Sequence, residues 1–151
     1  MAQSLARLWT HLVFSTKERY PYLTDAVMRD DMHRYLATVL RSHDCGTIIV
    51  GGCADHVHAL FALSRNHSIA EVVKEVKRTS SAWIKTVERR YSKFRWQAGY
   101  GAFSVSQSHV SDVQRYIERQ EEHHRRKTFQ DEFRAFLKKY QIDFDERYVW
   151  D

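Results

Sequence analysis

Two histidines separated by one residue are the feature of this chain best suited to chemistry. They lie in Asp55-His56-Val57-His58, directly before a short apolar run. Alternate side chains of a β-strand share a face, so His56 and His58 are predicted to point to one side and Val57 to the other. Two neighbouring imidazoles can bind one divalent metal ion. The chain has nine histidines, and ordinary core histidines explain such a pair equally well, so the motif alone leaves metal binding open.

A tyrosine and a glutamine one helical turn apart form the second candidate. Tyr116 and Gln120 share one face of a predicted helix. A glutamine oxygen is a competent ligand for Mg²⁺ or Mn²⁺, and tyrosine can act as a covalent nucleophile. The inward face of an amphipathic helix, with Val113 and Ile117 packed and the tyrosine hydroxyl hydrogen-bonded at the edge, has the same spacing. Spacing alone favours this packing interpretation.

Composition indicates one compact domain and is compatible with an anionic partner, although many ordinary enzymes are also basic. The chain has 151 residues, 43% hydrophobic residues, one proline and a formal net charge of +5. It contains no run of eighteen apolar residues, and its start lacks the apolar stretch of a secretory signal, so we expect a cytoplasmic protein without a membrane segment. The two cysteines, Cys45 and Cys53, are expected to stay reduced. The positive charge favours nucleic acid over a membrane surface.

The expected elements run strand, helix, strand, strand, helix, strand, followed by further helices. Strands are predicted at 9–15, 47–50, 56–58, 94–97 and 102–106, and helices at 25–42, 68–87, 108–125 and 130–140. This order matches an α+β, ferredoxin-like split βαβ fold, with an antiparallel sheet, helices on one face and appended C-terminal helices. The single domain, 1–151, divides into a sheet-and-helix core (1–106), a tyrosine helix (107–126) and a C-terminal helix and tail (127–151). This fold places the histidine pair either on the open face of the sheet or against a helix, and the open face is the better place for chemistry.

Other polar residues are compatible with roles near these motifs. The polar face of the second helix carries Lys74, Lys77, Arg78 and Lys85. These side chains fit a DNA-backbone contact and an ordinary solvated face equally well. Asp55 either orients one histidine or ends a turn. His124 lies one turn beyond Gln120, but a solvated histidine near a helix C-terminus is the favoured interpretation, and it is left out of the predicted site.

The two motifs together resemble the signatures of a known family, the single-tyrosine HUH transposases of the IS200/IS605 type. This family, also called Y1 transposases, includes the repeat-associated tyrosine transposases. The family's His-hydrophobic-His strand matches residues 56–58, and its Tyr-Ile-x-x-Gln helix matches residues 116–120. The likeness extends over nearly the whole chain, and residues 128–151 are more similar to the repeat-associated, host-adapted branch. It outweighs the packing interpretation of each motif.

The resemblance implies a transposase that cleaves and rejoins hairpin-containing single-stranded DNA ends. By this likeness His56, His58 and Gln120 bind Mg²⁺ or Mn²⁺. Tyr116 attacks the scissile phosphate, which forms a 5′-phosphotyrosine bond and releases a 3′-hydroxyl. Relatives are typically homodimers in which the tyrosine helix of one subunit completes the site of the other in trans. Two alternatives remain: a non-catalytic or domesticated hairpin-binding protein of the same fold, and a metal hydrolase without a tyrosine nucleophile.

Overall fold

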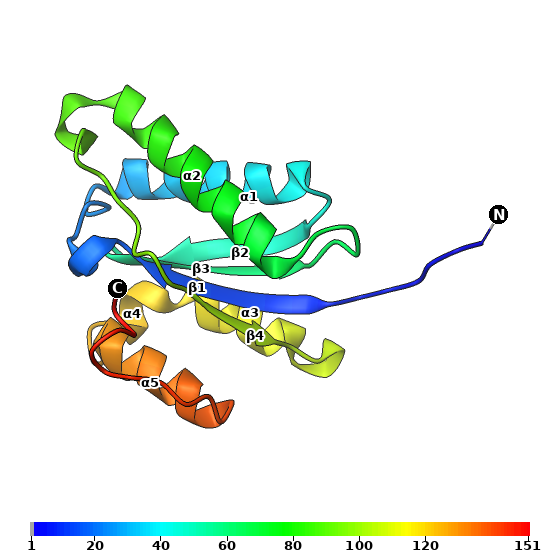
Figure 1. The fold of residues 1–151 in the computed structure, drawn as a ribbon. Helices are drawn as coiled ribbons and strands as arrows, with labels where there is room; N and C mark the ends of the chain where they lie inside the picture. The colour runs from blue at the N-terminus through cyan, green and yellow to red at the C-terminus, as the bar shows by residue number, and fades with distance from the viewer. Residues whose placement is uncertain (1) are drawn as a thin grey trace.

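A four-stranded antiparallel sheet forms the centre of the protein (Figure 1). The computed structural model describes residues 2–151, so Met1, the first residue of the predicted domain, lies outside it. The strands are β1 (Trp9–Ser15), β2 (Gly46–Gly52), β3 (His56–Ala62) and β4 (Gly101–Ser104), in the order β2-β3-β1-β4. The long helices α1 (Ala26–Ser42) and α2 (Ile69–Val87) connect them. This arrangement confirms the predicted α+β, ferredoxin-like fold.

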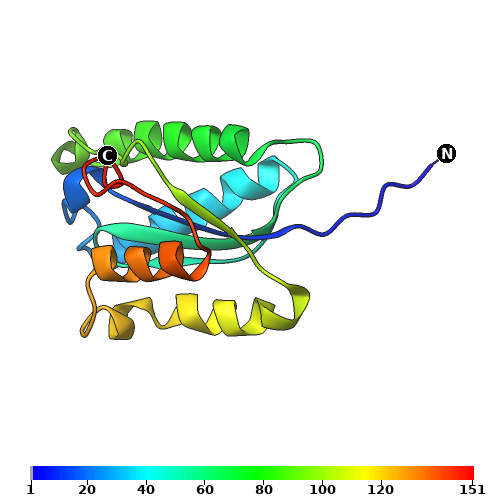
Figure 2. The same ribbon diagram turned by 60° about the horizontal axis from the view of Figure 1, so that its bottom comes forward.

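Helices cover both faces of the sheet. Helices α1 and α2 pack on one face, and three C-terminal helices lie against the other (Figures 1 and 2). The latter are α3 (Val110–Glu118), α4 (Gln120–His123) and α5 (Phe129–Lys139), and short 3-10 turns lie at Lys17–Arg19, Arg89–Tyr91 and Gln107–His109. Of the two placements considered for the histidines, the structure therefore has the one against helices, because the appended helices cover the side of β3 that carries them.

Alternation along β3 assigns its side chains to the two layers. Val57 and Phe61 belong to the larger apolar core under α1 and α2, whereas Leu60 packs with Ile117 of α3. His56 and His58 share the Leu60 side, as the period of two predicts. The strands β2 and β3 form the expected antiparallel pair. The apolar side of β3 therefore anchors the sheet, while the histidine side faces the C-terminal helices.

Side-chain caps fix the beginnings of the two long helices. The Ser68 hydroxyl accepts a hydrogen bond of 3.1 Å from the backbone N–H of Glu71, as the capping pattern predicted. At α1 the Asp25 carboxylate accepts one of 3.1 Å from the N–H of Met28. Each cap satisfies a donor that the first helical turn leaves unpaired. The predicted end of α1 at Ser42 is confirmed.

Two predicted elements differ in the structure. Residues 94–97 make only an isolated bridge, between Trp96 and Thr16. Farther along, the Lys77 ammonium donates hydrogen bonds to the carbonyls of Gln97 and Gly99. The predicted tyrosine helix is interrupted at Arg119, which has φ −100° and ψ 18°. This turn separates α3 from α4 and leaves the Gln120 side chain buried.

Two glycines allow the C-terminal helices to lie close to the sheet. A Cβ at Gly51 of β2 would lie 2.8 Å from Ile117 Cγ2 and 3.1 Å from Ile117 O. A Cβ at Gly101 of β4 would lie 2.4 Å from Phe133 Cε2. Both separations are below ordinary van der Waals contact, so a larger residue at either position forces Ile117 or Phe133, or the helix that carries it, to shift. These glycines therefore help to position the helices that cover the histidines.

Two further features of residues 2–151 concern the cysteines and the hydropathy of the helices. Cys45 and Cys53 are free thiols. No helix in this range has both the length and the apolar character needed to cross a membrane.

Candidate metal and tyrosine site

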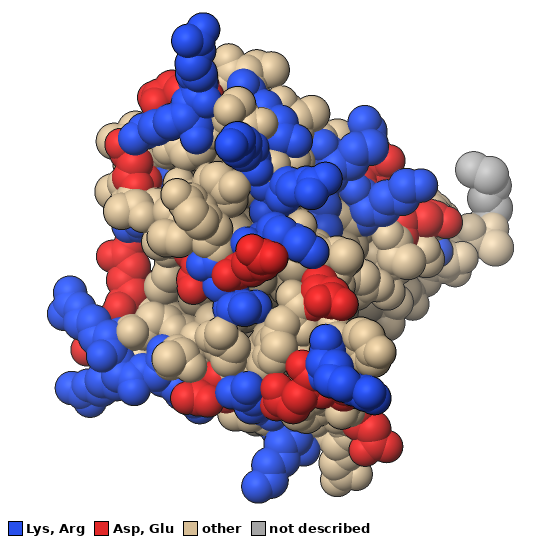
Figure 3. Space-filling model, turned by 60° about the vertical axis from the view of Figure 1, so that its left-hand side comes forward, with Lys and Arg blue, Asp and Glu red and all other residues tan. Residues whose placement is uncertain are grey.

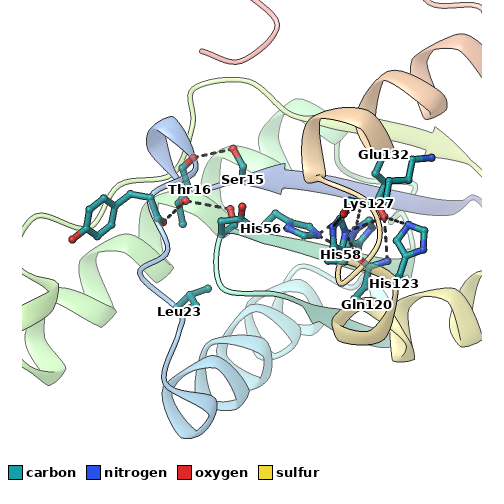
Figure 4. Close-up of polar contacts among 12 residues, drawn as sticks. Ser15, Thr16, Leu23, His56, His58, Gln120, His123, Lys127 and Glu132 are labelled. Atoms are coloured by element: carbon teal, nitrogen blue, oxygen red, sulfur yellow. Dashed lines mark hydrogen bonds and ion pairs between the residues drawn. The ribbon is translucent and has the colours of Figure 1, made fainter.

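The structure brings the four residues of the predicted site together in one chain. His56, His58 and Gln120 are almost completely buried, with exposed fractions of 0%, 0% and 1%. The Nε2 atom of His56 lies 3.1 Å from Gln120 Oε1. The rings of Tyr116 and His58 approach edge to face, with centroids 5.8 Å apart. Figure 4 shows the histidines of β3 and Gln120 converging on one point between the sheet and the helices.

Each histidine of β3 is held through its Nδ1 atom. His56 Nδ1 lies 2.7 Å from Asp55 Oδ1, and His58 Nδ1 lies 2.8 Å from Nε2 of His11 on β1. Both Nε2 atoms therefore point into the site. A hydrogen bond at one ring nitrogen fixes the orientation of the ring and sets the tautomer that leaves the other nitrogen free to bind a metal. The Asp55 side chain thus contacts His56, and His11 is an additional positioning residue that the sequence motifs did not indicate.

A buried glutamate from α5 completes the cluster. Glu132 is 2% exposed, and its Oε1 atom lies 3.0 Å from His58 Nε2. Its other oxygen accepts a hydrogen bond from the Tyr116 hydroxyl. Glu132 therefore places a carboxylate between the histidines and the tyrosine. Glu132 lies outside both sequence motifs and is not among the predicted site residues.

His124 belongs to the cluster, contrary to the sequence interpretation. Its Nε2 atom lies 3.1 Å from Gln120 Oε1 and 3.2 Å from Glu132 Oε2. Its Nδ1 atom lies 2.6 Å from the backbone carbonyl of Lys127, and only 11% of its side chain is exposed. The interpretation of a solvated histidine was wrong because the loop after α4 returns over the site and α5 then closes it.

The donor atoms have the spacing of a divalent-metal shell. Ligand atoms of His56, His58, His124 and Glu132 all lie within 4.8 Å of one another. With metal–ligand bonds near 2.1 Å, neighbouring donors of an octahedral shell are about 3 Å apart. His58 Nε2 lies 3.0 Å from Glu132 Oε1, and His124 Nε2 lies 3.2 Å from the other carboxylate oxygen, so each pair is close to this spacing. The residues present therefore fit a metal ion in both geometry and donor chemistry.

Burial and the Glu132 charge control protonation in the site. Burial lowers the pKa of His58 to about 4, against the opposing effect of Glu132, so this imidazole is neutral at pH 7. Burial also acts to raise the pKa of Glu132, but hydrogen bonds from His124, His58 and Tyr116 outweigh it and hold that pKa well below its usual range. Burial, reinforced by the Glu132 charge, raises the pKa of Tyr116 well above its usual range. The site therefore contains a carboxylate, a neutral His58 and a protonated phenol.

The basic residues predicted on α2 line a separate groove of about 430 Å³. Lys77 donates hydrogen bonds to the carbonyls of Gln97 and Gly99, and Arg78 pairs with Glu75 at 2.7 Å. Within residues 2–151, neither Lys74 nor Lys85 forms an ion pair or a side-chain hydrogen bond. Figure 3 shows Lys and Arg side chains gathered over the upper half of that view, at the level of α1 and α2. Two of the four predicted cations therefore have structural partners, and two are available to an anionic ligand.

The fold and this site together define a class of protein: ferredoxin-like sheet proteins that carry paired histidines on a central strand opposite a tyrosine helix. The family model described as "Transposase IS200 like" matches residues 4–120. The chain belongs to this family of IS200-like transposases. The matched range contains the histidine strand and the tyrosine helix and ends at Gln120, so Glu132 and the rest of α5 follow it.

Individual proteins are similar to this chain in sequence or in fold. The chain is 26% identical over 115 residues to the ISDra2 transposase TnpA of Deinococcus radiodurans, an alignment that covers 73% of this chain and 81% of the relative. A crystal structure assigned as a transposase from Deinococcus radiodurans R1 is similar, with a TM-score of 0.59 and 25% identity over 80% of this chain and 95% of that one. A REP-associated tyrosine transposase bound to a REP hairpin shares the fold, with a TM-score of 0.53 and 10% identity, covering 80% and 68%.

Proposed function

We propose that this transposase cleaves and rejoins hairpin-containing single-stranded DNA ends through a 5′-phosphotyrosine intermediate in a metal-dependent reaction. One observation carries the proposal: Tyr116 lies against the buried cluster of His56, His58 and Gln120, through its hydrogen bond to Glu132. A nucleophile beside a group of metal-binding donors is the arrangement that phosphoryl transfer needs. Family membership supports the same reaction class.

The metal site in this proposal consists of His56, His58 and Gln120, with Glu132 and His124 as further donors. A divalent ion held there supplies Lewis-acid polarisation of a non-bridging phosphate oxygen. Imidazole donors suit Mn²⁺ better than Mg²⁺, which prefers oxygen ligands. We therefore propose Mn²⁺ as the better activator of the two expected ions.

Tyr116 provides the attacking oxygen. Its hydroxyl already donates to Glu132, which holds the phenol in position. The phenol proton passes to solvent as the oxygen bonds to phosphorus, because the pKa of Glu132 lies well below its usual range and its carboxylate does not retain a proton. The bond from phosphorus to the 3′-oxygen breaks, and that oxygen takes up a proton to leave as a 3′-hydroxyl. A 3′-hydroxyl of another end reverses the step by attacking the phosphotyrosine. Cutting and joining therefore need no nucleotide cofactor.

The proposed partners are a DNA hairpin and a second copy of the chain. The fold is shared with a REP-associated tyrosine transposase that binds a REP hairpin, and this supports a hairpin ligand here. Lys74 and Lys85 are the best placed of the predicted DNA-binding residues, because Lys77 and Arg78 have protein partners. A homodimer in the cytoplasm remains our prediction. Because Tyr116 lies beside His58 of its own chain, we propose that the site works in cis.

One observation favours a second candidate, a domesticated hairpin-binding protein without catalytic activity. Burial and Glu132 raise the pKa of Tyr116, which opposes formation of the phenolate. A protein that only binds hairpins does not need a Tyr116 phenolate, so the raised pKa would not impair its function. The two candidates differ in one outcome, since only the transposase becomes covalently linked to DNA.

The test uses hairpin oligonucleotides taken from the DNA that flanks the gene. The purified protein is incubated with each oligonucleotide and either MnCl₂ or EDTA, and products are separated on denaturing gels. We expect cleavage and a slower protein–DNA band with Mn²⁺ only, and loss of both in Tyr116→Phe. Binding without cleavage would favour the domesticated protein. Cleavage that survives Tyr116→Phe would show a metal hydrolase that does not use this tyrosine.

A further inference from the structure

An apolar cavity of about 680 Å³ lies beside Tyr116, between β4, α3 and α5. Its walls include Val105, Val113, Phe136 and Tyr140, and Tyr116 and His11 also line it. The Phe136 ring packs edge to face on His11, with centroids 5.2 Å apart. The volume falls within the range of small-ligand pockets. Aromatic side chains and the proposed nucleophile therefore line the same cavity.

A second groove, of about 660 Å³, meets this cavity at the tyrosine. Its cationic side chains are Arg115, Arg119, Arg126 and Lys127, and its acidic ones are Glu122 and Asp112, of which Asp112 pairs with Arg115. Tyr116 and Lys127 line both spaces. A phosphate at the Tyr116 hydroxyl would therefore have an apolar cavity on one side and a row of cations on the other.

We propose that the apolar cavity binds an unpaired nucleobase of the cleaved strand, next to the scissile phosphate. This inference rests on the proposed function. Nucleobases have apolar faces that stack on aromatic rings, and phosphates are attracted to arginine and lysine side chains. The cavity offers Phe136 and Tyr140 to a base, while the adjoining groove offers Arg119 and Arg126 to neighbouring phosphates. In this arrangement the base lies in the apolar cavity, the scissile phosphate lies at Tyr116, and the next phosphates of the strand lie in the adjoining groove.

Charge at the cavity favours a nucleotide over an uncharged ligand. Lys127 and Lys139 lie along its lining. Asp112 is an acidic neighbour, but its carboxylate is paired with Arg115. The remaining anion in the lining is Glu132, which is 2% exposed and bonded to Tyr116 and the histidines. The accessible charge around the cavity is therefore mainly positive, as an attached phosphate backbone requires.

The test combines an altered cavity with an altered DNA. Ala135 lines the cavity from α5, and Ala135→Leu partly fills it without adding a ring that could itself stack. Ala26→Leu is the matched control, because Ala26 is an exposed helical alanine on the other face of the sheet. Both changes are made in Tyr116→Phe protein to prevent cleavage. Binding is measured by fluorescence anisotropy with the hairpin oligonucleotide from the gene flank, carrying an abasic site at each position around the cut in turn.

We expect one position beside the cut at which loss of the base weakens binding about tenfold. Ala135→Leu should weaken binding of the intact DNA by a similar factor and remove the effect of that abasic site, whereas Ala26→Leu should do neither. Equal binding of every abasic DNA would overturn the proposal. So would a change in oligomeric state in Ala135→Leu without loss of the base effect, which would show that a second copy occupies the cavity. Adduct formation by the otherwise unmodified protein, measured in parallel, tests the proposed function separately.

Discussion

The Tyr116 hydroxyl donates a hydrogen bond to the Glu132 carboxylate, and this bond joins α3 to α5. The same carboxylate lies 3.0 Å from His58 Nε2. Glu132 thus connects the proposed nucleophile with the proposed metal ligands. Its burial is tolerable because several donors surround it, since a buried charge without partners is strongly destabilising.

Replacing Glu132 with glutamine should weaken metal binding. Glu132→Gln keeps the size of the side chain but removes the only carboxylate of the cluster. We expect Mn²⁺ affinity, measured by isothermal titration calorimetry, to fall about tenfold or more. Asp131→Asn is the control, because Asp131 is an exposed neighbour on the same helix. Equal Mn²⁺ affinity in wild type and Glu132→Gln would exclude Glu132 as a ligand.

Mixing two inactive variants should not restore activity if the site works in cis. Tyr116→Phe lacks the nucleophile, and His58→Ala lacks a proposed ligand. Each mixed dimer then has a defect in every site, because Tyr116 and His58 of one chain act together. The expected result is no cleavage by the mixture. Recovery of about a quarter to a half of wild-type cleavage would show that the tyrosine acts in trans.

Lys77 should make stability depend on pH in the alkaline range. Burial lowers its pKa from 10.5 to about 8. The folded protein therefore loses this proton at lower pH than the unfolded chain, so the penalty for the buried charge is present below pH 8 and is relieved as pH rises toward 10.5. Relative to Lys77→Met, the free energy of unfolding of the wild type should rise by about 1 to 3 kcal/mol over this range. Urea titrations at each pH measure it, and parallel curves for the two proteins would refute it.

Gly51→Ala should destabilise the packing of α3 on the sheet. The added Cβ would lie 2.8 Å from Ile117 Cγ2, whereas a Cβ at Gly46 of the same strand meets nothing within 4 Å. Overpacking of this kind costs about 1 to 3 kcal/mol. We expect this loss in chemical denaturation of Gly51→Ala, with Gly46→Ala as the matched control. Similar stabilities of the two variants would show that α3 moves away from β2 at little cost.

Local patterns were sufficient to predict much of the framework. The period of two in residues 56–58 placed both histidines on one face, and the Ser68 capping pattern fixed the start of α2. The strand alternation and the helix cap each depend on residues close together in sequence, so the residue types alone predict them. The spacing of Tyr116 and Gln120 likewise placed them on one side of the polypeptide, even though Arg119 interrupts the helix between α3 and α4.

The remainder of the site depends on tertiary contacts that no local pattern specifies. Glu132 reaches the histidines only because the loop after α4 reverses the chain and α5 packs on β4 near Gly101. It lies between the exposed Asp131 and the buried Phe133, so its immediate neighbours do not specify whether Glu132 is buried. His124 was misinterpreted for the same reason. A signal was available in the Phe129, Phe133 and Leu137 spacing, which places Glu132 beside the buried stripe of α5.

The most direct measurement is the identification of the DNA-linked residue by mass spectrometry. The protein is incubated with Mn²⁺ and the hairpin oligonucleotide, digested with nuclease and protease, and searched for a peptide carrying a nucleotide through a phosphodiester bond. We predict that the modified peptide contains Tyr116, that the linkage is to the 5′-phosphate, and that EDTA abolishes it. A nucleotide attached to another residue, or an adduct that forms equally well in Tyr116→Phe, would contradict the account.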